Sequence, residues 1–386
     1  MSVATLLDGK RICVCCGSGG VGKTTTSAAI ALGMAAQGAK VAVVTIDPAK
    51  RLANALGLEE LGNEPRLVEP ARLRSGGLKL RGELWAMMLD PKRTFDELIE
   101  RLAPDHGSAE EILANRVYRE LSTAVAGSQE FTAVSKLYEL HHEYDFDLLV
   151  LDTPPSRNAL DFLDAPGRLT SFLEGRMLKM FVRPTGLGMK ILGRGTGALA
   201  AGLQRVTGVD LLADLSTFFR LLGGMTDDFR VRAAAVEKML MASTTAFVLV
   251  TSAQREPIDE AIWFRRTLRE TGFPFAGVIV NRVHHDILGC AERPVPLRGE
   301  VIDALADSLS ANLAARVAEN FHDYHVLARR DELNISRLET DGDARPLLLV
   351  PHFDDDVHDV DGLLLVHRYL FASDAKRERM IAEVVA

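Results

Sequence analysis

Residues 11–25 read RICVCCGSGGVGKTT and carry the strongest structural signal in the chain. Residues 11–16 form a short apolar run rich in small and β-branched side chains, which predicts a buried parallel strand. Residues 17–24 fit the pattern G-x-x-x-x-G-K-[S/T], and residues 25–37 place apolar side chains at helical spacing before Gly38 ends the helix. Strand, glycine loop and helix therefore follow in the order of a phosphate-binding loop, whose backbone amides and helix N-terminus attract anions.

The loop predicts specific roles for its side chains. Lys23 is expected to neutralise the β- and γ-phosphates of a nucleotide, and the Thr24 hydroxyl to coordinate Mg²⁺. The alternative is a glycine-rich turn with a chance lysine, but the flanking strand and helix argue against it. The expected nucleotide-binding residues of the loop are Gly19, Gly20, Val21, Gly22, Lys23, Thr24 and Thr25.

Two aspartates follow predicted strands. Residues 40–46 (KVAVVTI) end at Asp47, and residues 147–151 (DLLVL) end at Asp152. The carboxyl ends of parallel strands meet at the edge where α/β folds bind ligands. We therefore expect Asp152 to be the second Mg²⁺ ligand and Asp47 to orient the attacking water, although either could be an ordinary turn residue.

The chain has four cysteines, too few for a disulfide scaffold and typical of a reducing compartment. Cys13 and Cys16 formally make a C-x-x-C pair. On an extended strand, residues an odd number apart point to opposite faces, so this pair cannot readily hold one zinc ion. Core cysteines are the favoured interpretation.

The composition limits the class of protein. With 386 residues, 47% hydrophobic and 25% charged, the chain can build a large packed core and is not disordered as a whole. The net charge of -8 argues against a general nucleic-acid binder, so no nucleic-acid partner is expected. No signal-peptide core or long uncharged apolar run stands out, which predicts a cytoplasmic protein, with peripheral attachment to a membrane left open.

Further apolar strands alternate with helices along the chain. The pattern predicts an α/β fold, a mostly parallel sheet of the P-loop NTPase type covered by helices on both faces. An α-helical subdomain is expected as an insertion, at residues 93–143 and 165–244, with the core at 1–92, 144–164 and 245–386. The expected strands include 246–251, 275–281 and 346–350, and the expected helices include 93–103, 108–126, 129–142, 257–271 and 303–320.

Residues 175–209 have an unusual composition. The segment holds six basic and no acidic residues, and six of the 11 methionines lie between residues 177 and 241. One interpretation is an adaptable apolar surface with a cationic rim, suited to a hydrophobic or membrane-associated client. The other is a helical subdomain whose apolar residues pack internally.

Three segments carry a resemblance to a known family. GSGGVGKTTT, TIDPAKRLANALG and LDTPPSRNALDFL are similar to the phosphate loop and two switches of the arsenical-pump and tail-anchored-protein-targeting ATPases, a family of dimeric P-loop ATPases. The resemblance implies an Mg²⁺-dependent ATPase whose dimer opens and closes with ATP hydrolysis, with Lys23 and Asp47 as catalytic residues and Thr24 and Asp152 on the metal. It also implies that Asn281 contacts the adenine edge and that Pro351 and Phe353 line the base.

The chain departs from the family at several points. Ser18 stands where the family has a lysine that reaches the partner's phosphates across the dimer. Either an arginine substitutes for that lysine within a homodimer, or the chain pairs with a paralogue that carries it. Lys50 replaces the histidine of the first switch, and Cys290 stands alone where the family has a late C-x-x-C.

These departures leave alternatives open. Arsenite needs soft thiolates converging on one atom, so an arsenical pump subunit is not favoured. The ATPase subunit of an anion or metalloid transporter and a nucleotide-dependent assembly scaffold with little turnover remain the alternative functions. The histidines at 284–285, 322, 325 and 352–358 could bind a metal, but a solvated acidic loop is the preferred interpretation of the last run.

Overall fold

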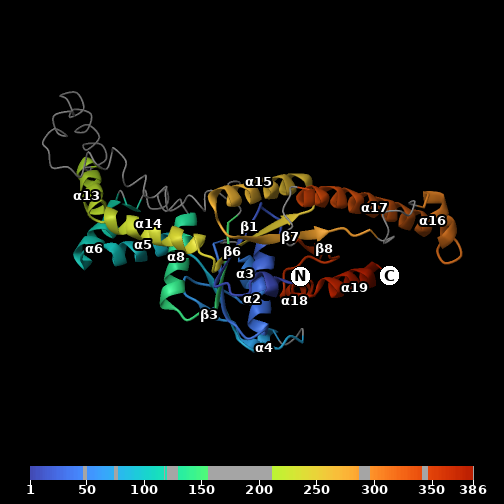
Figure 1. Cartoon of the computed structure of the whole chain (residues 1–386), viewed down its shortest axis with the longest axis horizontal. Helices are drawn as coiled ribbons and strands as arrows, with labels where there is room; N and C mark the ends of the chain where they lie inside the picture. The colour runs from blue at the N-terminus through green and yellow to red at the C-terminus, as the bar shows by residue number, and fades with distance from the viewer. Residues whose placement is uncertain are drawn as a thin grey trace, which may run out of the picture.

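Within the described residues, eight strands form one sheet in the order β3-β4-β2-β5-β1-β6-β7-β8 (Figure 1). Every neighbouring pair is parallel except β3 and β4, so the predicted α/β sheet is confirmed. The computed structural model describes residues 1–46, 50–73, 77–116, 118–119, 129–154, 211–286, 296–340 and 347–385. The strands are β1 (Ile12–Cys16), β2 (Lys40–Thr45), β3 (Arg66–Leu67), β4 (Glu83–Met88), β5 (Leu148–Asp152), β6 (Thr245–Ser252), β7 (Phe275–Val283) and β8 (Leu347–Pro351).

The register of the central strands sets the position of the site. β1 lies between β5 and β6, and Cys15 pairs with Asp152 across the β1–β5 boundary. Thr45 at the end of β2 pairs with the same aspartate from the other side. The carboxyl ends of β1, β2 and β5 therefore meet beside the loop that follows β1, which is the edge where α/β sheets bind ligands.

Helices cover both faces of the sheet. On one face α2 packs with α18, through buried residues such as Leu32 and Leu363. On the other face α8, α15 and α17 bury Leu137, Phe264 and Leu338. The helices are α1 (Val3–Leu6), α2 (Lys23–Ala36), α3 (Arg51–Ala55), α4 (Pro70–Leu73), α5 (Pro91–Leu102), α6 (His106–Ala114), α8 (Gln129–Glu143), α13 (Leu211–Gly224), α14 (Thr226–Met241), α15 (Arg255–Thr271), α16 (Arg298–Leu305), α17 (Ala311–Thr340), α18 (Val360–Phe371) and α19 (Asp374–Val385).

The cysteines of β1 divide between the two cores. Cys13 and Cys15 lie in the core under α2, whereas Cys16 lies in the core on the opposite face. The prediction that Cys13 and Cys16 point to opposite faces of the sheet is therefore confirmed. Burial raises the pKa of the Cys16 thiol, which keeps it protonated and unreactive.

A third apolar cluster lies at one end of the molecule, where α5, α6, α13 and α14 gather (Figure 1). The rings of Phe95 and Phe229 stack with centroids 6.3 Å apart, and Met225 is fully buried. Met225 therefore packs inside the helical region, as the second interpretation of its composition predicts. The cationic segment 175–209 lies outside the described residues.

Three features differ from the sequence-based expectations. The helix expected over 108–126 is interrupted, because α6 ends at Ala114 and the Asn115 backbone is extended. The single helix expected over 303–320 is wrong, because α16 ends at Leu305 and α17 begins at Ala311. Residues 306–308 form a turn between the two helices, in which the Ser308 amide donates to the Leu305 carbonyl at 3.1 Å. The two-residue antiparallel strand β3 is too short for any periodicity to predict. Among the described helices, none combines the length and apolarity needed to cross a bilayer.

Candidate nucleotide site

The glycines of the loop after β1 are required by its geometry. Gly17, Gly20 and Gly22 have φ of 153°, 78° and 92°, in the left-handed region that other residues rarely adopt. A Cβ at Gly22 would lie 2.3 Å from Asn281 Nδ2, and one at Gly17 would lie 1.9 Å from the Val250 carbonyl oxygen. Glycine is therefore required at positions 17 and 22, because β6 and β7 approach the loop backbone too closely for a Cβ.

Asn281, at the end region of β7, braces the loop. Its Nδ2 donates to the Val21 carbonyl at 3.0 Å, while its Oδ1 accepts from the Arg282 amide at 3.0 Å. Arg282 has φ of 58°, and its guanidinium donates to the Gly20 carbonyl at 3.5 Å. In this structure the Asn281 amide thus supports the phosphate loop, and its contact with adenine stays a prediction.

Lys23 and Thr24 open α2 on the cavity side of the loop. Lys23 Nζ donates to the Ser18 carbonyl at 2.7 Å, so the cation is folded back onto its own loop. Thr24 Oγ1 donates to Asp152 Oδ2 at 2.7 Å, and Thr45 Oγ1 donates to the same oxygen at 2.8 Å. A hydroxyl and a buried carboxylate are thereby brought together at the carboxyl ends of three strands.

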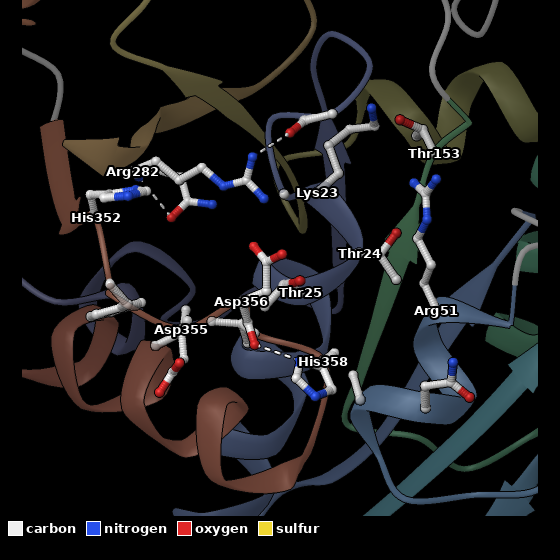
Figure 2. A pocket seen from close by; sticks show the side chains of 18 residues that line it. Lys23, Thr24, Thr25, Arg51, Thr153, Arg282, His352, Asp355, Asp356 and His358 are labelled. Carbon is white, nitrogen blue, oxygen red and sulfur yellow. Dashed lines mark hydrogen bonds between the residues drawn. The ribbon is translucent and has the colours of Figure 1, made fainter.

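A cavity of about 460 Å³ opens beside the loop (Figure 2). Seven of the expected site residues line it: Gly20, Gly22, Lys23, Thr24, Thr25, Asn281 and Phe353. Gly19, Val21 and the buried Asp152 are not among the lining residues, and Pro351 lines an adjoining cavity of about 940 Å³ that shares Phe353. Asp47 lies outside the described residues, so its role stays a prediction.

The cavity is also lined by residues that the sequence did not indicate, both basic and acidic, the acidic ones being Asp355 and Asp356. Arg51 and Arg282 contribute positive charge, Thr153 follows the buried Asp152, and His352 faces the same cavity (Figure 2). Burial lowers the pKa of His352, and the neighbouring His284 and Arg282 lower it further, so the ring is neutral at pH 7. Arg282 directly follows Asn281, and His352 stands between Pro351 and Phe353. Their position next to expected base-contact residues is the sequence signal that indicates them.

The residues that depart from the family pattern point away from the cavity. The Ser18 hydroxyl donates to a carboxylate oxygen of Glu260 on α15, and neither residue lines the cavity. Lys50 Nζ lies 3.4 Å from Glu60 Oε1 and lines a separate pocket of about 170 Å³. Position 18 therefore adds no positive charge to the nucleotide cavity of this chain.

Comparison with known proteins shows that this sequence is similar to ATPases. Residues 10–328 match the model of a family described as anion-transporting ATPases. An ATPase GET3 from Malassezia globosa is 25% identical over 287 residues, covering 73% of this chain and 76% of that protein. An ATPase get3 from Schizosaccharomyces japonicus is 30% identical over 150 residues, covering 39% and 42% of the two chains. An ATPase GET3 from Mycosarcoma maydis is 26% identical over 222 residues, covering 55% and 58%. The chain thus spans less than two thirds of the length of the last two relatives.

Proposed function

Because the chain belongs to the anion-transporting ATPase family, whose members hydrolyse ATP, we propose that it is an Mg²⁺-dependent ATPase that handles a hydrophobic or membrane-associated client. ATP would occupy the cavity beside the loop, with its phosphates against Gly20, Gly22 and Thr25. Opening and closing of a dimer would couple hydrolysis to the client. A soluble location in the cytoplasm, with contact to a membrane during client transfer, is part of this proposal.

The contact between Thr24 and Asp152 is the observation that carries the proposal. Its 2.7 Å hydrogen bond places a hydroxyl and a carboxylate oxygen at one point beside the phosphate loop. Oxygen ligands of this kind are those that Mg²⁺ prefers. The residues present therefore fit a magnesium ion held by Thr24 and Asp152, and when bound the ion would neutralise phosphate charge.

Lys23 supplies the second part of the argument. Its ammonium group now donates to a neutral carbonyl of Ser18, a weaker partner than an ionised phosphate. Rotation of this flexible side chain toward the cavity would exchange the carbonyl for the β- and γ-phosphates. Asp47, at the end of β2, is proposed to orient the hydrolytic water, since phosphoryl transfer depends on positioning and charge stabilisation.

The binding step can be tested by calorimetry with Mg²⁺ and ATP on the full chain. Lys23→Ala should weaken binding about 100-fold or more, because it removes a charge-assisted contact inside a low-dielectric site. Lys92→Ala is the matched control, since this exposed lysine pairs with Asp96 on α5 and is not a lining residue. Equal affinity of the wild type and Lys23→Ala, or no uptake by the wild type, would overturn the proposal.

The client is proposed to bind in the region of residues 165–244. The support is compositional: a cationic, methionine-containing segment in an acidic chain suits a hydrophobic helix flanked by charged lipid headgroups. A labelled apolar peptide of about 20 residues, long enough to span a bilayer, is the probe. If deleting residues 177–205 leaves its binding intact, this segment is packed internally and the client proposal fails.

A second candidate function is the ATPase subunit of an anion transporter. The family description favours it, because the matched model is named for anion transport. Cys13, Cys15 and Cys16 are buried within the sheet and cannot present thiolates to a metalloid. Among the described residues, an oxyanion without thiol affinity, such as sulfate, would therefore be a better substrate than arsenite. Stimulation of ATP hydrolysis by such an anion but not by the peptide would favour this candidate.

A further inference from the structure

The two arginines that line the cavity lie at opposite sides of it (Figure 2). Arg282 lies beside His352, near the residues expected to contact the base. Arg51 extends from α3 toward Thr153 and the loop side chains Lys23 and Thr24 (Figure 2). The cavity therefore has a second cation at its phosphate side, besides the lysine of the loop.

The packing of α3 fixes the direction of Arg51. Leu52, Ala53 and Ala55 are buried, and Leu52 joins the core beneath α2. Arg51 lines the cavity together with Asn54 and Ala55, and the i, i+3, i+4 spacing places these three residues on one face of α3. The preceding Lys50 turns to Glu60 instead, at 3.4 Å. Two neighbouring cations thus go to different places, and only one of them lines the cavity.

The neighbours of Arg51 identify which part of a nucleotide it would meet. Thr153 directly follows Asp152, the carboxylate that accepts from Thr24 at 2.7 Å. Thr24, the loop lysine and Arg51 therefore line the same cavity, and the buried Asp152 lies behind Thr24, to which it is hydrogen-bonded. The terminal phosphate carries the most negative charge of a triphosphate. Arg51 lies on the side of the cavity where Thr24 and Asp152 would hold Mg²⁺, so the terminal phosphate is the group that it would meet.

We propose that Arg51 binds the terminal phosphate of ATP within the same chain and makes the site prefer triphosphate over diphosphate. This inference rests on the proposed function. A guanidinium can contact two phosphate oxygens at once, which a lysine cannot do. Position 18 supplies no charge to this cavity, since its hydroxyl is bonded to Glu260. Arg51, the first residue of α3, would thus make the affinity of the site depend on whether the nucleotide carries a terminal phosphate.

The test compares the affinities of a nonhydrolysable ATP analogue and of ADP, both with Mg²⁺, by calorimetry on the full chain. Arg51→Gln should weaken the triphosphate about 10- to 100-fold and ADP by less than about threefold, the range expected for one charged hydrogen-bonding group. Arg51→Lys should recover part of the triphosphate affinity, because the charge remains. Lys50→Gln is the matched control and should change neither affinity, since its charge is directed to Glu60.

The outcomes separate this inference from the proposed function. If Arg51→Gln leaves the triphosphate affinity unchanged, or weakens ADP as much as the triphosphate, the role of Arg51 is overturned. The proposed function still stands in that case, provided that the wild type binds the nucleotides and Lys23→Ala abolishes the binding. If the wild type takes up neither nucleotide, the proposed function fails and the role of Arg51 fails with it. Circular dichroism of each variant identifies any that is misfolded, and Arg51→Lys then decides in place of Arg51→Gln.

Discussion

At the residue scale, the glycines of the phosphate loop differ in the reason why another residue would not fit. Gly17 has φ of 153° and a Cβ there would lie 1.9 Å from the Val250 backbone oxygen, just beyond the last paired residues of β1 and β6. Gly20 has φ of 78°, but nothing lies within 4 Å of its Cβ position. Space therefore constrains Gly17, whereas only conformation constrains Gly20.

Gly17→Ala should lower the free energy of unfolding by about 3 kcal/mol or more, because a backbone oxygen in a buried strand cannot move aside. Gly20→Ala should cost about 1–2 kcal/mol, the price of a left-handed alanine. Urea unfolding of the two variants and the wild type measures both values. Similar losses for the two variants would contradict the close approach of β6 to the loop.

At the element scale, the crossing of α2 and α18 depends on a single missing methyl group. A Cβ at Gly33 would lie 2.1 Å from Phe371 Cε2, so the ring occupies the space that another residue would fill. Gly33→Ala should destabilise the protein by about 1–3 kcal/mol through overpacking. Since the clash is with a side chain, the double variant Gly33→Ala with Phe371→Leu should be less destabilised than the sum of the two single variants. Additive losses in thermal or urea unfolding would show that the two residues do not meet.

The elements also show what the sequence could predict. Apolar runs bounded by Gly, Pro or Asp placed β1, β2 and β5 within a residue or two, because burial on both faces makes such runs continuous. The order of the strands could not be read in this way. β5 enters between β1 and β2 from more than a hundred residues along the chain, and this pairing depends on tertiary packing.

The same limit applies to the site. The phosphate loop, Thr24 and Asp152 were expected from motif and strand-end position, and the structure brings the last two together at 2.7 Å. Arg51 could not be predicted, because no local pattern distinguishes a cation that lines a cavity from one that faces solvent, whereas His352 stands between two expected base-contact residues. The break between α16 and α17 was missed because Ser308 and Leu309 sit in an otherwise helical pattern.

At the scale of the whole molecule, the position of Ser18 bears on how many chains make an active unit. Its hydroxyl is held by Glu260 on α15, so this chain presents neutral oxygen where related ATPases are expected to present a lysine to the partner. Arg51 is proposed to hold the terminal phosphate in the ground state, and the proposed closing of two chains would add the charge stabilisation that turnover needs. A paralogue that carries the lysine would supply this charge.

We therefore expect the purified chain alone to hydrolyse ATP slowly, and the addition of such a paralogue to raise the rate about 100-fold or more, as charges supplied in trans do in other phosphoryl-transfer enzymes. Steady-state hydrolysis measures the rate, and analytical ultracentrifugation shows whether a one-to-one complex forms. The paralogue with its loop lysine changed to alanine is the control, because it should still form the complex without restoring the rate. Fast turnover by the isolated chain, or full stimulation by the altered paralogue, would show that this chain completes its active site without a lysine from a partner.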